Sequence, residues 1–191
     1  YCIVSKKFTQ KNKKIINIKN TKSFLKKFAL ANRENADAKI IAVTGSAGKT
    51  TVKTILGNIL NCYEPTYFSP KSYNNHYGVP ISLSNVEKKH KYSVFEIGMS
   101  KAGEINTLSA LVKPKIAIIT NVAEAHIENF KDLKGIANAK SEIIKNIQKN
   151  GTLIINRDDK FYKFFKRKAL NRGLQIITFG KSKNSDVHLM S

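Results

Sequence analysis

The sequence has 191 residues, of which 41% are hydrophobic, and this suits one ordinary domain with room for part of a second. The formal net charge is +21, but only four of the 34 basic residues are arginine, the residue favoured for forked contacts with bases and phosphates, so we expect no nucleic-acid partner. No apolar run approaches the roughly 18 residues of a membrane helix, and Cys2 and Cys62 match neither a zinc nor a redox spacing, so we expect a cytoplasmic protein without membrane insertion.

Residues 1–36 are polar and rich in lysine and asparagine. Within this segment, residues 15–18 predict a short strand. Thr21 predicts the N-cap of a helix whose apolar residues follow at helical spacing between residues 24 and 30. The sequence begins with Tyr1 rather than methionine, and we expect it to be part of a larger protein.

A different pattern begins at residue 39, where short apolar runs alternate with stretches of helical periodicity. Residues 40–43 predict a buried strand, and a glycine-rich loop and an amphipathic helix follow it. Further strands are predicted at residues 93–97, 116–120, 152–155 and 175–178, and further helices at residues 104–112, 135–147 and 159–170. This alternation predicts an α/β fold, a doubly wound and mostly parallel sheet with helices on both faces. Ligands of such sheets bind beyond the carboxyl ends of the strands.

The glycine-rich loop over residues 45–50 carries the strongest chemical signal. Gly45 and Gly48 let the backbone turn tightly and direct N–H groups at phosphate oxygens. Lys49 can reach the β- and γ-phosphates of a nucleotide, and the hydroxyl of Thr50 can bind Mg²⁺. The loop therefore predicts a fold of the P-loop type that binds a nucleoside triphosphate, ATP, with Mg²⁺.

The loop departs from the general P-loop pattern, which has a glycine at the position of Val43. We interpret it as a shortened variant; the alternative is a chance Gly-Lys-Thr turn, which the strand before it and the helix after it disfavour. The predicted nucleotide-binding residues are Gly45, Ser46, Ala47, Gly48, Lys49, Thr50 and Thr51.

Residues 44–51 resemble the phosphate loop of the Mur ligases and of their folylpolyglutamate synthetase relatives. Five later segments resemble further motifs of this family in the same order, and together the six motifs cover residues 40–160. These segments are Asn74-Asn75-His76-Tyr77-Gly78-Val79-Pro80, Glu96-Ile97-Gly98-Met99-Ser100, Thr120-Asn121-Val122-Ala123-Glu124-Ala125-His126, Ala139-Lys140-Ser141-Glu142-Ile143 and Asn156-Arg157-Asp158-Asp159. Within the family, Val52-Lys53 and the segments around His126 and Lys140 look most like the members that add D-alanyl-D-alanine.

This resemblance implies an ATP-dependent carbon–nitrogen ligase of peptidoglycan precursor synthesis. ATP would phosphorylate the carboxylate of a UDP-muramoyl tripeptide, and the amine of D-alanyl-D-alanine would attack the acyl phosphate to give an amide, ADP and phosphate. Charge accumulates on the phosphoryl group, so positioning and cations should supply most of the catalysis. We expect a monomer. A folylpolyglutamate synthetase-like ligase and a non-catalytic, nucleotide-dependent binding module are the alternatives.

The resemblance also implies roles for individual side chains. Glu96 ends a buried strand, where a carboxylate is costly unless it is paired or bound to a metal. By resemblance Glu96 and His126 bind Mg²⁺ together with Thr50, and Lys140 is carbamylated by carbon dioxide, which turns it into an anionic metal ligand. Lys49, His126 and Lys140 are thus the predicted catalytic residues. The residues alone leave open a Glu96–lysine ion pair, a structural His126 and a solvated Lys140.

Polar side chains at two other places predict ligand contacts. Asn156 ends a predicted strand and is expected to bond to the adenine or ribose, while one of the two aspartates that follow it caps the next helix. The predicted substrate contacts are Asn74, Asn75 and Ser100; an ordinary asparagine-rich turn is the alternative for the first two.

Mur ligases have three domains. The resemblance therefore implies that residues 1–36 are a linker or the remainder of the N-terminal substrate domain. Residues 37–191 would be the ATP-binding central domain, and the C-terminal domain would lie outside this sequence. We expect this chain alone to fold and to bind nucleotide, but not to form the amide.

Overall fold

The computed structural model describes residues 1–5, 12–125 and 127–190, and it contains one seven-stranded and one two-stranded sheet. The strands are β1 (Cys2–Val4), β2 (Ile15–Asn17), β3 (Lys39–Thr44), β4 (Thr66–Phe68), β5 (Tyr92–Glu96), β6 (Ile116–Ile119), β7 (Thr152–Asn156), β8 (Gln175–Gly180) and β9 (Val187–His188). The helices are α1 (Thr21–Asn35), α2 (Lys49–Asn61), α3 (Gly78–Leu83), α4 (Glu104–Val112), α5 (Leu133–Ser141) and α6 (Tyr162–Leu170), with 3-10 helices η1 (Ile127–Asn129) and η2 (Glu142–Asn146).

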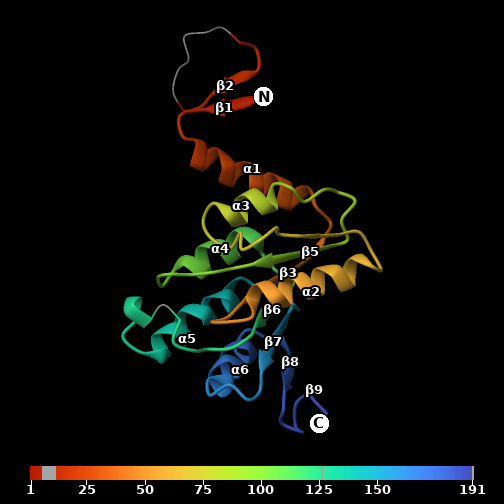
Figure 1. The fold of residues 1–191 in the computed structure, drawn as a ribbon, viewed down its shortest axis with the longest axis vertical. Coiled ribbons are helices and arrows are strands. Elements are labelled where there is room, and N and C mark those ends of the chain that lie inside the picture. The colour runs from red at the N-terminus through yellow and green to blue at the C-terminus, as the bar shows by residue number, and fades with distance from the viewer. Residues whose placement is uncertain (6–11, 126, 191) are drawn as a thin grey trace.

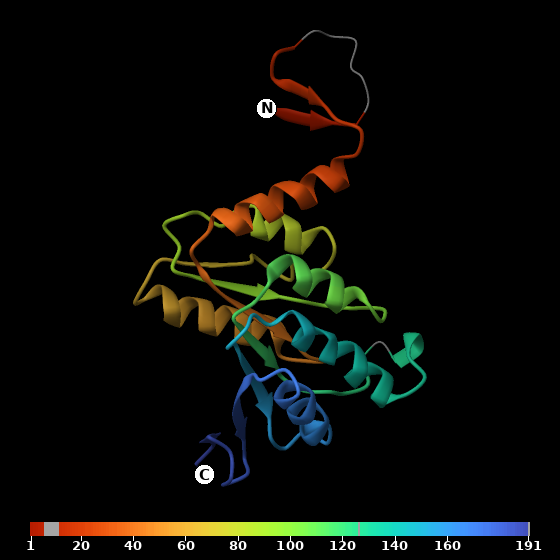
Figure 2. The same cartoon turned by 180° about the vertical axis from the view of Figure 1, so that it is seen from behind.

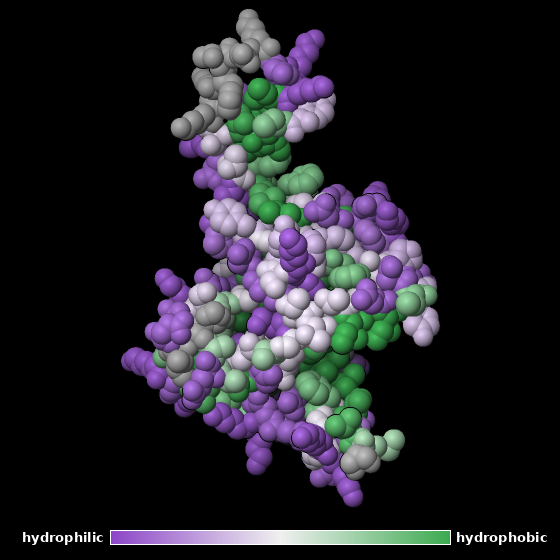
Figure 3. All heavy atoms as spheres, viewed as in Figure 1, coloured by the Kyte–Doolittle hydropathy of each residue, from purple (hydrophilic) through white to green (hydrophobic). Residues whose placement is uncertain are grey.

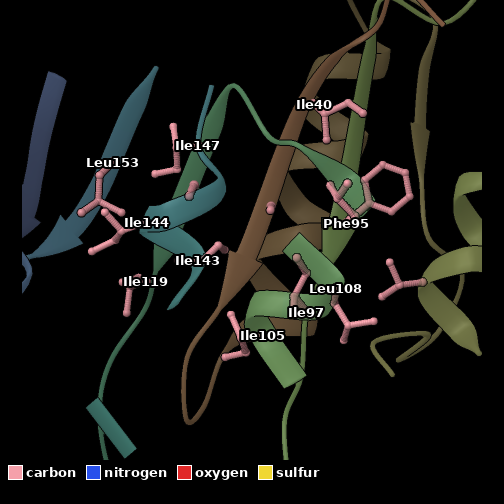
Figure 4. Close-up of a cluster of buried hydrophobic side chains, with 14 of the residues drawn as sticks. Ile40, Phe95, Ile97, Ile105, Leu108, Ile119, Ile143, Ile144, Ile147 and Leu153 are labelled. Atoms are coloured by element: carbon pink, nitrogen blue, oxygen red, sulfur yellow. The ribbon is translucent and has the colours of Figure 1, made fainter. Parts of the chain in front are cut away.

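The larger sheet has the strand order β4-β5-β3-β6-β7-β8-β9, and each neighbouring pair in it is parallel. The side chains of β3 alternate between two hydrophobic clusters, as expected of a strand buried on both faces. Ile40 and Ala42 belong to the larger cluster, and Ile41 and Val43 to the smaller one. Figure 4 shows part of the larger cluster, where side chains from α4 and η2 meet those of the strands.

Helices cover both faces of this sheet (Figures 1 and 2). α2 lies on one face, where Val52, Leu56 and Leu60 pack against the smaller cluster. α3, α4, α5 and α6 contribute buried side chains to the larger cluster on the opposite face. The predicted α/β fold, with a parallel sheet between two layers of helices, is therefore confirmed. Within the described ranges, no helix combines the length and apolar character needed to cross a membrane.

The end of α1 joins this core, whereas β1 and β2 lie away from the larger sheet (Figure 1). Ala29 is completely buried. The side-chain amide of Asn32 donates to the backbone oxygens of Ser84 at 2.7 Å and Val86 at 3.1 Å. Arg33 Nε donates to the backbone oxygen of Val112 at 2.9 Å. These contacts fix α1 beside α3 and α4.

Some predicted boundaries were wrong for local reasons. Asn20 rather than Thr21 is the N-cap of α1, because its Oδ1 accepts a hydrogen bond from Ser23 N at 2.8 Å. The helix predicted over residues 135–147 is α5 followed by η2; Ser141 Oγ donates to Asn138 O at 2.6 Å, a local bond that competes with regular helix geometry. The short elements β4, α3 and β9 were not predicted, because two to six residues carry too little periodicity.

Candidate functional site

The glycine-rich loop joins the end of β3 to the start of α2, and its two glycines meet different needs. A Cβ atom on Gly45 would come within 1.8 Å of Thr120 Oγ1, so the first glycine permits the close approach of the segment that follows β6. Gly48 is the N-cap of α2 and has a φ of 78°, a left-handed conformation that glycine adopts without strain. Beyond it the first N–H groups of α2 have no partners within the helix, and the helix dipole favours an anion there.

The segment that follows β6 holds this loop in place. Thr120 Oγ1 donates to Ala47 O at 2.6 Å, and Asn121 Oδ1 accepts from Ala47 N at 2.9 Å. Asn121 O accepts from Ser46 N at 3.0 Å, and Ser46 Oγ donates to Ala123 O at 2.9 Å. Thr120 and Asn121 stand in the motif that ends at His126, although the sequence predicted no role for either of them. Their hydrogen bonds hold the glycine-rich loop against the segment that follows β6.

Lys49 turns back over the loop that precedes it. Its Nζ donates to Gly45 O at 3.0 Å and to Ser46 O at 3.3 Å. These bonds are to neutral carbonyl oxygens, so the positive charge of Lys49 stays available to an anion at the mouth of the loop.

The structure brings Thr50 and Glu96 together at the carboxyl ends of β3 and β5. Thr50 Oγ1 donates to Glu96 Oε2 at 2.7 Å, and Asn74 Nδ2 donates to Glu96 Oε1 at 2.7 Å. Glu96 is 1% exposed, so both carboxylate oxygens are buried with neutral donors. Among the described residues no lysine lies within ion-pair distance of Glu96, which disfavours the alternative of a Glu96–lysine pair.

A cavity of about 800 Å³ opens beside the loop. Its wall includes seven of the residues that the sequence analysis selected: Gly45, Ser46, Lys49, Asn74, Asn75, Ser100 and Lys140. Lys140 stands in the last turn of α5 and is only 3% exposed. Burial, and secondly the charge of Lys49, lower the pKa of Lys140 from 10.5 to about 7. A large part of this amine is therefore uncharged near neutral pH, which makes it a nucleophile.

Asn75 and Ser100 line the cavity and also make hydrogen bonds within its wall. Asn75 Oδ1 accepts hydrogen bonds from Tyr77 N at 3.0 Å and Gly78 N at 2.9 Å, where α3 begins. Ser100 N donates to Glu104 Oε2 at 2.6 Å. The amide group of Asn75 is thus partly engaged in capping α3, and the hydroxyl of Ser100 is the group left for a ligand.

Two predicted residues, Thr51 and Asn156, are not part of the described cavity wall. Thr51 is exposed on α2. Asn156 ends β7, two strands from β3, and the part of the cavity wall that the structure describes does not include it. Of the two aspartates after it, Asp159 accepts from Phe161 N at 2.8 Å just before α6 and from Val122 N at 2.7 Å. His126 lies outside the described residues.

Glu142 has a structural role that sequence reasoning missed. Its Oε1 accepts from Gly103 N at 2.8 Å and its Oε2 from Asn106 N at 3.0 Å, so it caps the start of α4 from another helix. Lys140 and Glu142 belong to the same motif. The motif therefore places one side chain in the cavity and fixes the cavity wall with the other.

The side chains present suit a nucleoside triphosphate with Mg²⁺. The hydroxyl of Thr50 and the carboxylate of Glu96 offer hard oxygen donors 2.7 Å apart, the type of ligand that Mg²⁺ prefers. The ammonium of Lys49 and the free N–H groups at the start of α2 suit phosphate oxygens.

The parallel sheet, the glycine loop and the Thr50–Glu96 pair define a P-loop protein of the α/β class. A family described as "Mur ligase middle domain" matches residues 43–190, so the chain belongs to the Mur ligase family. The UDP-N-acetylmuramoyl-tripeptide--D-alanyl-D-alanine ligase of Rickettsia prowazekii is 40% identical over 98% of this chain. The chain spans 42% of that relative's length.

Solved structures agree with this membership. The crystal structure of MurF from Acinetobacter baumannii superimposes with a TM-score of 0.85 at 35% identity, covering 96% of this chain and 40% of that one. The MurF ligase of Thermotoga maritima in complex with ADP gives a TM-score of 0.84 at 30% identity, covering 99% of this chain and 43% of that one. The predicted family is therefore confirmed, and these matches carry the name of the D-alanyl-D-alanine-adding branch that the motifs predicted.

Proposed function

We propose that the protein to which this chain belongs is an ATP-dependent ligase that joins D-alanyl-D-alanine to a UDP-muramoyl tripeptide. The observation that carries this proposal is the meeting of the phosphate loop, Lys49 and Lys140 at one cavity of about 800 Å³. The Thr50–Glu96 pair adjoins that cavity through Asn74. The names of the matched ligases support the identity of the two substrates.

In this proposal the chain's own residues bind and orient the reactants. The free N–H groups at the start of α2 and the ammonium of Lys49 hold the phosphates of ATP, and Thr50 and Glu96 hold Mg²⁺. When bound, the metal ion supplies counter-charge to the phosphate oxygens. Asn74, Asn75 and Ser100 face the peptide substrate, whose carboxylate receives the phosphoryl group before the amine attacks.

Lys140 is proposed to act as a carbamate. The uncharged amine attacks the carbon of carbon dioxide, an N–C bond forms as one C–O π bond opens, and one proton leaves to solvent, so that a neutral amine becomes an anionic oxygen ligand. The lowered pKa of Lys140 supports this step, since only the uncharged amine reacts. We propose His126 as a further Mg²⁺ ligand and Asn156 as a contact of the adenosine part.

We also propose that residues 37–191 form the ATP-binding domain and that residues 1–36 contribute to a substrate-binding domain. Hydrophobic surface gathers at the top of Figure 3, over β1, β2 and the first part of α1, and the exposed hydrophobic residues of these three elements include Ile3, Ile16 and Phe28. An exposed apolar surface of this kind supports contact with another part of the protein.

The test measures ATP-dependent phosphate release and amide formation by the full-length protein. Phosphate release with amide product should require both UDP-muramoyl tripeptide and D-alanyl-D-alanine. Release that instead requires a folate and glutamate would establish the folylpolyglutamate synthetase-like alternative. Nucleotide binding without release under either condition would establish the binding module.

A further inference from the structure

Lys53 is one of the most deeply buried side chains of the protein, although it is a lysine. It stands on α2 and is 1% exposed. Its Nζ donates to Ser69 O at 2.6 Å and to Lys71 O, and no carboxylate of the described residues lies within ion-pair distance. Lysine is rarely buried without a charged partner, and an apolar side chain of the same volume would fold at least as well. The two carbonyl groups that Lys53 holds therefore account for a lysine at this position.

Both carbonyl groups belong to the loop that leads from β4 to the Thr50–Glu96 pair. Lys71 has a φ of 45°, a left-handed conformation unusual for a residue other than glycine, so the loop needs outside support there. Directly beyond it, Ser72 Oγ lies 3.2 Å from Thr50 Oγ1, and Asn74 Nδ2 donates to Glu96 Oε1 at 2.7 Å. The end of the loop thus contacts Thr50 and Glu96, the two side chains that offer oxygen ligands.

The helix geometry explains how one side chain can control this loop. Thr50 and Lys53 are three residues apart on α2, so they lie on the same face of the helix, one turn from each other. Lys53 Nζ donates to Ser69 O where the loop begins, whereas Thr50 Oγ1 contacts Ser72 Oγ three residues later. Gly98 N donates to Asn74 O at 2.8 Å, which fixes the loop to the end of β5 as well.

We infer that Lys53 is a positioning residue, which fixes the segment of residues 69–74 so that Ser72 and Asn74 hold the Thr50–Glu96 pair in its metal-binding arrangement. This inference rests on the proposed function, since it concerns the Mg²⁺ that accompanies ATP. Burial lowers the pKa of Lys53, and the nearby carboxylate of Glu96 partly opposes that effect, in agreement with a cation placed beside the pair.

The test is ATP binding by the full-length protein as a function of Mg²⁺ concentration, measured by calorimetry. Lys53→Met keeps most of the length and volume of the side chain but removes both hydrogen bonds, and Lys53→Arg keeps the donors. Lys163→Met, at an exposed lysine of α6, is the matched control. In Lys53→Met the Mg²⁺ concentration for half-maximal binding should rise by about 10-fold or more, the effect of losing one charge-assisted hydrogen bond. ATP binding without Mg²⁺ should change by less than about 2-fold, and Lys53→Arg should retain most of the wild-type response.

A double-mutant cycle separates positioning from a general loss of stability. If Lys53 acts through Asn74, the combined change Lys53→Met with Asn74→Ala should weaken the Mg²⁺ response much less than the product of the single effects. Independent effects in the cycle, or an unchanged Mg²⁺ response in a folded Lys53→Met protein, would overturn the inference. If Lys53→Met does not fold, Lys53→Arg provides the test. A dependence of ATP binding on Mg²⁺ in Lys53→Arg that is as weak as in Asn74→Ala would refute the inference. If the wild-type protein itself shows no Mg²⁺-dependent ATP binding, the proposed function falls and this inference with it.

Discussion

Replacing Lys140 with methionine should stabilise the fold, because the folded protein disfavours the charged form of this buried amine. The pKa of Lys140 is lowered from 10.5 to about 7. At about 1.4 kcal/mol per pKa unit, the charged amine costs the folded state up to about 5 kcal/mol relative to the unfolded chain. Local relaxation around the amine reduces such penalties, so we expect Lys140→Met to gain about 2–4 kcal/mol below pH 7.

The sign of the pH dependence follows from proton binding. Between about pH 7 and pH 10.5 the unfolded chain still holds a proton at Lys140 that the folded protein has released, so the free energy of unfolding of the wild-type protein rises with pH. The advantage of Lys140→Met should therefore be greatest below pH 7. It should shrink by roughly 0.5–2 kcal/mol from about pH 7 to about pH 9.

The assay is urea unfolding of both proteins at several pH values in buffers free of carbon dioxide, which keep the amine unmodified. Lys163→Met, at an exposed lysine, serves as the control, and its difference from the wild-type protein should stay within about 0.5 kcal/mol at every pH. A constant difference between Lys140→Met and the wild-type protein from about pH 6 to about pH 9 would refute the reasoning about this amine.

Three further changes test the phosphate loop. Lys49→Ala should reduce ATP-dependent phosphate release by two orders of magnitude or more, since losing one contact to the developing charge typically costs ~3–4 kcal/mol; turnover near the wild-type rate would contradict it. Gly45→Ala should lower the free energy of unfolding by about 2 kcal/mol or more in urea titrations, because the new Cβ meets Thr120 Oγ1 at 1.8 Å; an unchanged midpoint would show that the loop can shift freely. Asn121→Ala leaves Ala47 N without its side-chain acceptor and should weaken ATP binding by about 5–10-fold in calorimetry, and an unaltered Kd would remove the bracing role.

The sequence was informative where one residue type has a single physical use. A glycine-lysine-threonine turn after a buried strand predicted the loop, and the apolar runs predicted the central strands of the sheet. Glu96 was selected because a carboxylate at the end of a buried strand needs a partner, and the structure provides Thr50 and Asn74. These predictions depend on local chemistry, which can be inferred from residues that are close together in the sequence.

The rest depended on contacts between residues far apart in the chain. Thr120 and Asn121 hold a loop more than 70 positions earlier, and Glu142 caps a helix that begins 38 residues before it. No periodicity or spacing in one sequence reports such pairs, because threonine, asparagine and glutamate are equally suited to exposed positions. The edge strand β4, which leads to Asn74, was not predicted because its three residues carry too little periodicity.

The three lysines around the candidate site differ in their hydrogen bonds and burial, and these surroundings rather than the residue type distinguish them. Lys49 bonds to two carbonyl oxygens of its own loop and keeps its charge for an anion, while Lys53 holds the carbonyl groups of a neighbouring loop and is closed off from solvent. Lys140 has no hydrogen bond from Nζ within the described residues, and it is buried beside the charge of Lys49. Repulsion by one lysine thus helps to keep another uncharged. Composition could not separate these three among 34 basic residues, because the separation arises only when the fold assigns each amine its neighbours.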